Sequence, residues 1–224
     1  MKSAPAQAAK APPMSFEGAK WIWSSSSLGE DGRSYPAEVR FFRAALTLPQ
    51  GTQVTSAELI VTCDNMFVLF LNGKLAGESE ASNNCWGNPR WFDVAGMLVP
   101  GRNVIAVEAV NTLPGPAGLI AKLVVRLGDG RQVVRVTDAS WKFSDEEVAN
   151  WHRADFDDKV WADAYVVADF GAMPWRKPTP RGGAVRAGGA MTAARRATSR
   201  AYEALKASAK RGGTSAASTV TEIK

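Results

Sequence analysis

Asp64 and Asn65 are the residues of this sequence whose types and position best suit binding chemistry. They stand between two stretches, 59–63 and 67–71, whose apolar residues alternate with period two, as in β-strands. Carboxylate and amide oxygens held at a strand end suit sugar hydroxyls or a hard cation. The pair would equally suit a bulge or turn closed by side-chain-to-backbone hydrogen bonds. This stretch by itself leaves both interpretations open.

Other chemistry-bearing residues are sparse. The chain has one histidine, His152, and two cysteines, Cys63 and Cys85, without CxxC spacing, so a conventional zinc or histidine-based catalytic site is not expected. It also lacks GxSxG, P-loop and GxGxxG motifs. A disulfide between Cys63 and Cys85 would tie the loop around Trp86 to the preceding strand, and it needs Cα atoms within ~7 Å. Two free thiols are the alternative.

Short strands must position these residues. Asn72-Gly73 predicts a two-residue hairpin turn, and 128–130 predicts a second hairpin between 119–127 and 132–137. The stretch 103–110 is apolar on both faces, as in a central strand. Strands of this length with frequent turn signals indicate an all-β fold, an antiparallel β-sandwich over residues 19–175.

Charge divides the chain into a nearly balanced body and a basic tail. Residues 176–224 contain 11 Lys or Arg and 2 Asp or Glu, whereas residues 1–175 contain 16 and 20, so the net charge of +5 comes from the tail. We therefore expect a flexible leader over 1–18 and a flexible basic low-complexity tail over 176–224. Residues 191–210 would form one short Ala-rich helix or stay disordered. The tail has no interleaved aromatic residues for stacking, so we expect no nucleic-acid partner.

Seven motifs follow one another along residues 19–175: WIW, VRFFRAALTLP, SAELIVTCDNMFVLFLNGKLAG, FDVAGMLVPGRNVIAVEAVN, PAGLIAKLVV, TDASWKFS and DFDDKVWADA. In this order they resemble the motifs of the galactose-binding-like jelly roll. The version they resemble is attached to bacterial α-L-rhamnosidases and includes their rhamnose-binding carbohydrate-binding module.

The resemblance implies a ligand site. By position, its sugar-binding residues are Asp64 and Asn65, with Trp86 stacking on the apolar face of the sugar. It also implies a calcium ion held by Asn65, Asn111 and the carbonyl of Pro116, which are oxygen donors of the kind calcium takes. As alternatives, Asn111 would cap a turn, Pro116 would stiffen a loop and Trp86 would pack in the core.

The resemblance assigns no catalytic residue to this chain, because the catalytic carboxylates of such enzymes lie in a separate helical domain. Asp155, Asp157 and Asp158 match the structural DFDD motif, which we expect to form a turn beside Trp161. A glycosidase needs two carboxylates set apart across a cleft, and neighbours in one loop do not provide this.

The expected function is therefore a non-catalytic carbohydrate-binding module, assisted by calcium, that serves as an ancillary part of a secreted protein of the glycoside-hydrolase type. Its partners would be a rhamnose- or galactose-like sugar and a neighbouring catalytic domain. The alternative is a structural or protein-interaction jelly roll that binds no sugar. The resemblance implies an extracellular or periplasmic location, although the sequence as given has no signal peptide. No apolar run approaches a membrane span, so we expect no membrane partner.

Overall fold

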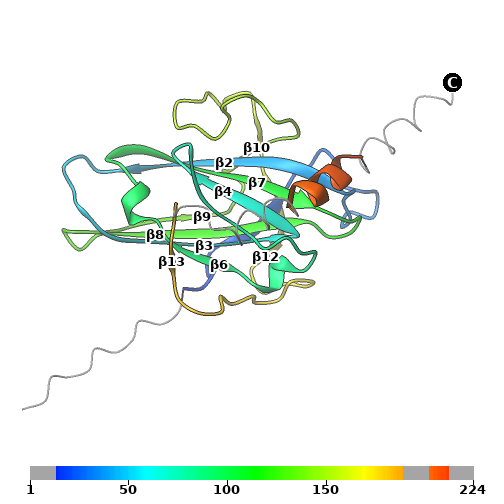
Figure 1. The fold of residues 1–224 in the computed structure, drawn as a ribbon, viewed down its shortest axis with the longest axis horizontal. Coiled ribbons are helices and arrows are strands. Elements are labelled where there is room, and N and C mark those ends of the chain that lie inside the picture. The colour runs from blue at the N-terminus through cyan, green and yellow to red at the C-terminus, as the bar shows by residue number, and fades with distance from the viewer. Residues whose placement is uncertain (1–13, 189–201, 212–224) are drawn as a thin grey trace, which may run out of the picture.

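Two β-sheets face each other across the core of the protein (Figure 1). The structure is a computed structural model that describes residues 14–188 and 202–211. One sheet has seven strands and the other six, and all pairs are antiparallel except β13 with β6. The predicted all-β sandwich is confirmed. Along its strands, side chains that point into the core alternate with side chains that point outward.

The seven-stranded sheet has the order β12-β1-β8-β3-β6-β13, and β9 pairs with β8 beside this path. Its long central pair, β3 with β8, joins Asp64 to Gly118 at one end of the sandwich. The strands are β1 (Lys20–Trp23), β3 (Val54–Asp64), β6 (Arg90–Asp93), β8 (Gly118–Leu127), β9 (Gln132–Val136), β12 (Tyr165–Asp169) and β13 (Val185–Arg186).

The six-stranded sheet has the order β11-β10-β2-β7-β4-β5. The strand predicted to be central, β7, lies between β2 and β4 and is buried on both faces, as expected from its continuous apolar sequence. The strands are β2 (Glu38–Leu48), β4 (Met66–Leu71), β5 (Lys74–Glu78), β7 (Gly101–Asn111), β10 (Lys142–Ser144) and β11 (Ala162–Asp163).

Asp64 and Asn65 form the corner where the chain passes from one sheet to the other. β3 belongs to the seven-stranded sheet and β4 to the six-stranded sheet, and a cis peptide bond joins the two residues. The predicted polar break between two strands is therefore present, and it separates two layers. Inward residues on both sides, such as Cys63 and Phe67, are fully buried in the shared core.

The predicted hairpin at Asn72-Gly73 is confirmed. It joins β4 to β5, and both residues have positive φ, 52° for Asn72 and 80° for Gly73. Asparagine and glycine tolerate this conformation, which matches the twist of a two-residue hairpin. The Asn72 side chain also donates a hydrogen bond of 2.8 Å to Asn103 Oδ1, which fixes the turn against the start of β7.

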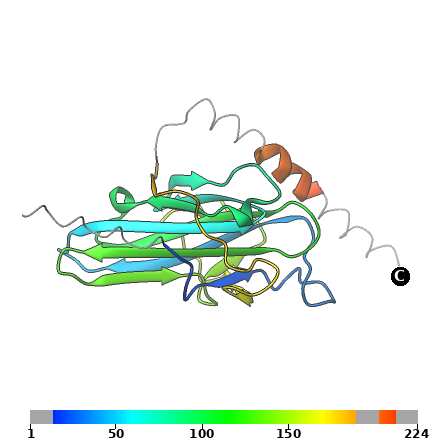
Figure 2. The same cartoon turned by 90° about the horizontal axis from the view of Figure 1, so that it is seen from below.

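Both predicted domain boundaries need correction. The leader was placed over 1–18, but Phe16 is fully buried against an aromatic cluster that includes Trp175. After residue 175 the chain continues along the sandwich, where β13 pairs with β6 (Figure 2). These segments are short and polar or alanine-rich, so their contacts with the sandwich leave no strong periodicity in the sequence.

A helix over residues 202–211 packs on the outer face of the six-stranded sheet, near β7 (Figure 1). Its Tyr202 and Ala209 are buried, and the Tyr202 hydroxyl donates to Glu108 Oε1 at 2.9 Å. Lys206 Nζ lies 2.7 Å from Glu108 Oε2. The rest of the predicted helix, 191–201, lies outside the described residues. Within the described residues, no helix is both long and apolar enough to cross a membrane.

The DFDD motif forms a structural loop, as expected. Asp158 Oδ2 accepts a hydrogen bond of 2.8 Å from Nε of Arg43, whose side chain is fully buried. The remaining guanidinium nitrogens donate to the carbonyl oxygens of Trp151, Arg153 and Phe156. Loop 145–161 is thereby fixed to β2.

Candidate functional site

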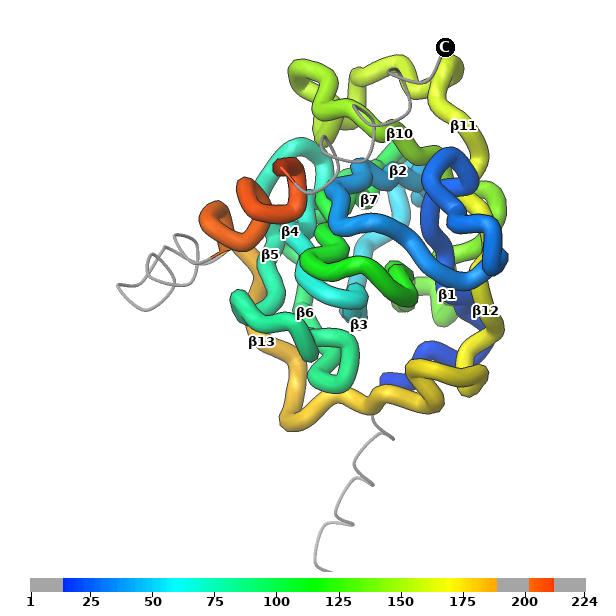
Figure 3. The backbone as a smooth tube through the Cα atoms, turned by 90° about the vertical axis from the view of Figure 1, so that its right-hand side faces the viewer, coloured from blue at the N-terminus to red at the C-terminus, as the bar shows by residue number. Residues whose placement is uncertain are grey.

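The ends of β3 and β7 and the start of β8 meet at one end of the sandwich. Asp64 pairs with Gly118 across β3 and β8. The backbone N–H of Asn65 donates to Val110 O at 2.8 Å, which places Asn65 beside Asn111 at the end of β7. Figure 3 views this end of the molecule, where loops 24–36, 80–88 and 112–117 gather. The topology therefore brings Asp64, Asn65 and Asn111 together.

The side-chain amide of Asn65 takes part in four hydrogen bonds, two donated and two accepted. Its Nδ2 donates to Asp64 Oδ1 at 2.7 Å and to Asn83 O at 2.6 Å. Its Oδ1 accepts from the backbone N–H of Thr112 at 2.8 Å and from the Thr112 hydroxyl at 2.7 Å. The amide thus joins the β3 corner to both neighbouring loops. It is 7% exposed.

Asp64 is a buried carboxylate whose hydrogen-bond donors are neutral. Its Oδ2 accepts from Trp175 Nε1 at 2.7 Å, and its Oδ1 accepts from Asn65. Among the described residues, no lysine, arginine or histidine forms an ion pair with it. Burial raises the pKa of Asp64 from 3.8 to about 6, against the lowering effect of the two hydrogen bonds.

Trp175 reaches Asp64 by lying across the seven-stranded sheet. Its ring stacks on Trp21 of β1, with centroids 4.4 Å apart and planes 24° apart. The stack needs a glycine beneath it, because a Cβ at Gly118 would lie 2.9 Å from Trp21 and 3.1 Å from Trp175. Gly118 is the β8 partner of Asp64, so the same strand position seats the stack and places the indole N–H beside the carboxylate.

Asn111 and Pro116 lie on either side of a short loop. Asn111 is 1% exposed and donates from Nδ2 to Pro36 O at 2.8 Å. Pro116 stands two residues before Gly118 and is exposed. It lines a pocket of about 470 Å3 together with Trp175. Asn111 therefore also has the capping contact that its alternative interpretation requires.

Trp86 belongs to a 3-10 turn, Cys85–Gly87, that is tied to the same corner. Thr62 Oγ1 donates to Cys85 O at 2.9 Å. The Trp86 side chain is half-buried and packs against the aromatic cluster of Trp21 and Trp175. It is partly packed and partly exposed, so both core packing and sugar stacking are compatible with its position.

The cysteines are both buried and both free, so the structure holds no disulfide between them. Cys63 points into the main core, whereas Cys85 belongs to the cluster on the outer face of the six-stranded sheet. Cys85 Sγ donates to Glu80 O at 2.9 Å and thus closes the loop locally. The loop is fixed through hydrogen bonds from Asn65 and Thr62.

Sequence reasoning missed two residues of this site, Trp175 and Asn83. Trp175 appeared as the last residue of the domain, with no sign that it returns to Asp64 across 111 positions. Asn83 accepts a hydrogen bond at its backbone carbonyl, and its Oδ1 lies 2.8 Å from the Thr112 hydroxyl, whose single hydrogen it shares with Asn65 Oδ1. Asn83 lies in a loop rich in polar residues, where composition does not single out one side chain.

The residues present fit a calcium ion in donor chemistry. Amide, carbonyl and carboxylate oxygens gather at the corner, and hard oxygen donors of this kind are what calcium takes. The described residues contain no cluster of three His, Cys, Asp or Glu that would hold a metal. An ion bound through Asn65 Oδ1 would have to share that oxygen with the two hydrogens that Thr112 donates.

No family model matches the chain. Among known proteins, it is 39% identical over 181 residues to an alpha-L-rhamnosidase of Streptomyces avermitilis, a match that covers 80% of this chain and 17% of the relative. A crystal structure of the Streptomyces avermitilis enzyme, complexed with L-rhamnose, matches with a TM-score of 0.69 and 38% identity over 80% of this chain and 17% of that one. The chain thus spans a small part of these relatives.

Two further structures share the fold. A lectin from Pleurotus ostreatus in complex with GalNAc has a TM-score of 0.67 and 27% identity over 77% of this chain and 49% of its own. A GH78 family rhamnosidase of Bacillus sp. GL1 has a TM-score of 0.60 and 29% identity, over 73% of this chain and 20% of its own. The chain thus has a two-sheet β-sandwich fold and resembles a domain-sized part of alpha-L-rhamnosidases.

Proposed function

We propose that this chain is a non-catalytic carbohydrate-binding module whose sugar site is the corner formed by Asp64, Asn65, Asn111 and Pro116. The observation that carries the proposal is the Asp64 carboxylate, which is 8% exposed and whose hydrogen-bond donors, among residues 14–188 and 202–211, are all neutral. A buried charge without an opposite charge is costly to the folded state. Such a cost is typical of a site that keeps a charge for a ligand.

The chemistry of the corner suits a polyol. Each Asp64 oxygen already accepts one hydrogen bond from the protein and keeps a further lone pair, which would accept a sugar hydroxyl. Hydrogen bonds to a charged acceptor contribute about 1.5–3 kcal/mol, roughly twice as much as neutral ones. Trp86, half-buried beside the corner, would offer its ring to the apolar face of the sugar.

Calcium is part of the proposal. Asn65, Asn111 and the carbonyl of Pro116 would hold the ion. Its positive charge would offset the negative charge of Asp64, and the ion would bind vicinal hydroxyls of the sugar. The protein's own contribution is to fix the oxygens before any ligand arrives. Asn65 is held through Asn83 and Thr112, so little side-chain freedom is lost on binding.

The relatives support a sugar ligand and an ancillary role. One relative was crystallised with L-rhamnose and another with GalNAc, and this chain covers 17% of the first and 49% of the second. As part of a larger secreted enzyme, the module would bind the polymer and keep a neighbouring catalytic domain close to it. The effective concentration of that domain at its substrate would thereby rise. Catalysis itself would belong to that other domain.

The test is isothermal titration calorimetry of the whole chain with L-rhamnose and with GalNAc, each in millimolar calcium and in chelator. We expect saturable binding of one of the two sugars, weakened by the chelator. Asp64→Asn should lower the affinity at least tenfold, since loss of the charged acceptor costs about 1.5 kcal/mol or more. Asp163→Asn, an exposed carboxylate paired with Lys142, is the matched control and should bind as the wild type does.

A structural or protein-interaction jelly roll is the second candidate. It is favoured by Asn65, whose amide is fully engaged with protein partners, and by Asn111, which caps a loop through Pro36. This candidate predicts no binding of either sugar and no calcium effect on stability. It also predicts that Asn111→Ala destabilises the protein in chelator, because a loop hydrogen bond is lost.

A further inference from the structure

We propose that the ligand extends beyond one sugar and that the pocket beside Trp175 is a subsite for the next unit of the glycan. The inference rests on the proposed function of the Asp64 corner. The pocket has a volume of about 470 Å3 and is lined by Arg33, Tyr35, Pro116, Tyr165, Met173 and Trp175, among others. This volume lies within the range of about 300–1,000 Å3 that is usual for small-ligand sites.

The pocket shares two residues with the Asp64 corner. Pro116 lines the pocket and belongs to the proposed sugar site. Trp175 also lines it, and the same indole ring donates to Asp64. A sugar at the corner would therefore have its neighbour in the chain on the pocket side of Trp175.

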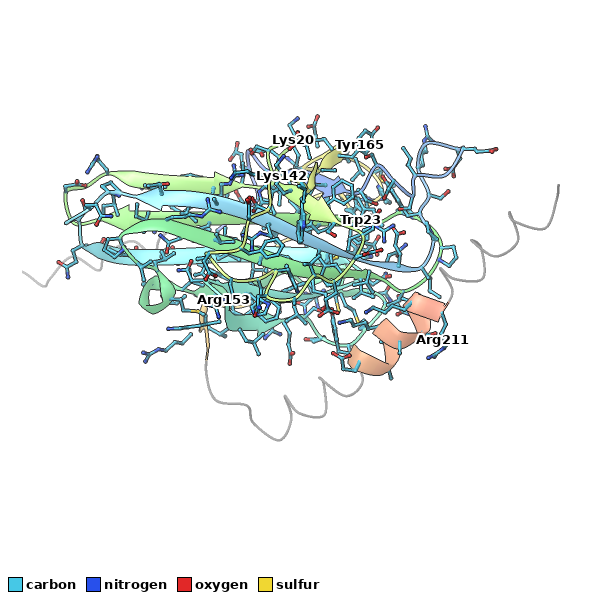
Figure 4. All side chains as sticks on the ribbon, turned by 90° about the horizontal axis from the view of Figure 1, so that it is seen from above. Lys20, Trp23, Lys142, Arg153, Tyr165 and Arg211 are labelled. Atoms are coloured by element: carbon cyan, nitrogen blue, oxygen red, sulfur yellow. The ribbon has the colours of Figure 1, made fainter. Side chains whose placement is uncertain are left out.

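The walls of the pocket are held by the fold. The backbone of Tyr35 makes two hydrogen bonds with Gly115, of 2.8 and 2.9 Å, so loop 24–36 is tied to loop 112–117. Tyr165 is the first residue of β12 and pairs with Trp23 of β1, and Figure 4 labels both side chains. A pocket whose walls are held in this way loses little freedom when a ligand binds.

The rim of the pocket exposes apolar surface that the fold does not need. Tyr165 is 43% exposed and Met173 is 68% exposed, and both line the pocket. Adjacent exposed apolar side chains around a concave surface mark a ligand or partner site. A tyrosine ring suits the C–H face of a pyranose, because its π face carries negative charge density.

Polar groups complete the match to a glycan. The Tyr35 hydroxyl is buried and has no hydrogen-bond partner among the described residues. Such unsatisfied groups destabilise the folded state and are rare in native structures. Arg33 is exposed at the rim and makes no ion pair within the described part of the chain. An aromatic face with a few polar groups around it is the composition expected for a sugar subsite, and it is less suited to a purely apolar ligand.

The experiment compares L-rhamnose with two disaccharides that carry it at the non-reducing end, α-1,2- and α-1,6-linked rhamnosyl-glucose, by calorimetry on the whole chain in calcium. We expect at least one disaccharide to bind about fivefold to tenfold more tightly than L-rhamnose. Tyr165→Ala should remove that gain and leave the affinity for L-rhamnose unchanged. Tyr35→Phe, which keeps the ring and removes the unpartnered hydroxyl, should reduce the gain without loss of folding. Val134→Ala, on an exposed residue of β9 away from the pocket, is the control.

The outcomes separate the subsite from the proposed function. Rhamnose binding with no gain for either disaccharide would overturn the subsite and leave the Asp64 site intact. Equal weakening of L-rhamnose and the disaccharides by Tyr165→Ala would also overturn it, because the residue would then act at the first sugar. No binding of any of the three sugars would contradict the proposed function together with the subsite.

Discussion

Asp64 and Asp158 are both held against the sandwich by hydrogen bonds to nitrogen, but the charges on their partners differ. Asp158 accepts from the guanidinium of Arg43, a buried cation that also donates to three carbonyl oxygens. Asp64 accepts from an indole and an amide, and neither carries charge. The first arrangement neutralises both partners, whereas the second leaves a net charge under the surface.

The difference separates a structural carboxylate from one that suits a ligand. The Arg43–Asp158 pair fixes loop 145–161 and offers no remaining charge to a partner molecule. The Asp64 corner holds its oxygens in place without cancelling their charge, so a cation or a set of hydroxyl groups would complete it.

The largest expected effect is on stability at the structural pair. Arg43→Met should lower the free energy of unfolding by about 3–5 kcal/mol, because it leaves Asp158 and three carbonyl oxygens without their donor. Sugar affinity of the folded fraction should be unchanged, since the pair lies in a different part of the fold. Urea unfolding monitored by tryptophan fluorescence checks the first point, and calorimetry checks the second. A stable variant with weakened sugar binding would contradict the division between the two regions.

The pH dependence of stability should reveal Asp64. Its pKa rises from 3.8 to about 6 on folding, so protonation of Asp64 adds to the stability of the folded state. This stabilisation is complete below about pH 4 and is lost as the pH rises through about 6. A rise of this size corresponds to up to roughly 3 kcal/mol. Unfolding free energies measured between pH 4 and 7 without calcium should show this loss, and Asp64→Asn should remove it. An identical pH profile in the two proteins would show that Asp64 is not the titrating group.

Trp175→Phe should have a smaller effect at the same carboxylate. The ring keeps its stack on Trp21, but Asp64 Oδ2 loses its donor, which should cost about 1–2 kcal/mol of stability above pH 6. The pKa of Asp64 should rise further, so sugar binding should need a higher pH. Trp21→Phe is the matched control, because the Trp21 N–H is buried and has no hydrogen-bond partner in the part of the chain that the structure describes. Equal shifts of the binding pH profile in both variants would argue against a specific role for Trp175.

The smallest effect is expected at the helix over 202–211. Lys206→Ala removes the ion pair with Glu108, a contact of 2.7 Å. The helix can then detach and expose Glu108 to water, so the change should stay local. We expect backbone amides of 202–211 to exchange roughly tenfold faster, a change of ~1.4 kcal/mol, with no change in global unfolding. Glu203→Gln, an exposed position on the same helix, serves as the control. Faster exchange throughout the sandwich would mean that the helix supports the whole fold.

The sequence predicted the sandwich because its strands depend on local pattern, whereas the family resemblance pointed to Asp64, Asn65 and Asn111 as one site. Alternation defined β3 and β4, Asn72-Gly73 defined the hairpin of β4 with β5, and polar residues marked the strand ends. The contacts of the two chain ends with the sandwich were not predicted, for the opposite reason. Phe16 and Tyr202 pack through a few side chains in short segments, and no local rule shows what they contact.

The partners of the site residues were equally hidden. Trp175 lies 111 positions from Asp64, and its approach depends on the absence of a side chain at Gly118. The glycine, the indole and the carboxylate are each unremarkable in the sequence, and only their geometry shows that they belong together. The roles of Trp86 and Pro116 stay predictions, because packing and loop contacts account for their positions as well as ligand binding does.

The most direct test of the proposed role of Asp64 is the pKa of its carboxyl, measured by carbon-detected NMR titration with and without calcium and L-rhamnose. We expect a pKa of about 6 in the free protein, because burial is not offset by a neighbouring cation among the described residues. We expect a clear decrease of this pKa when ion and sugar bind, since an opposite charge and new hydrogen bonds favour the ionised form. A pKa near 4 in the free protein, or one that calcium and L-rhamnose leave unchanged, would contradict the claim that Asp64 is kept as a ligand-binding charge.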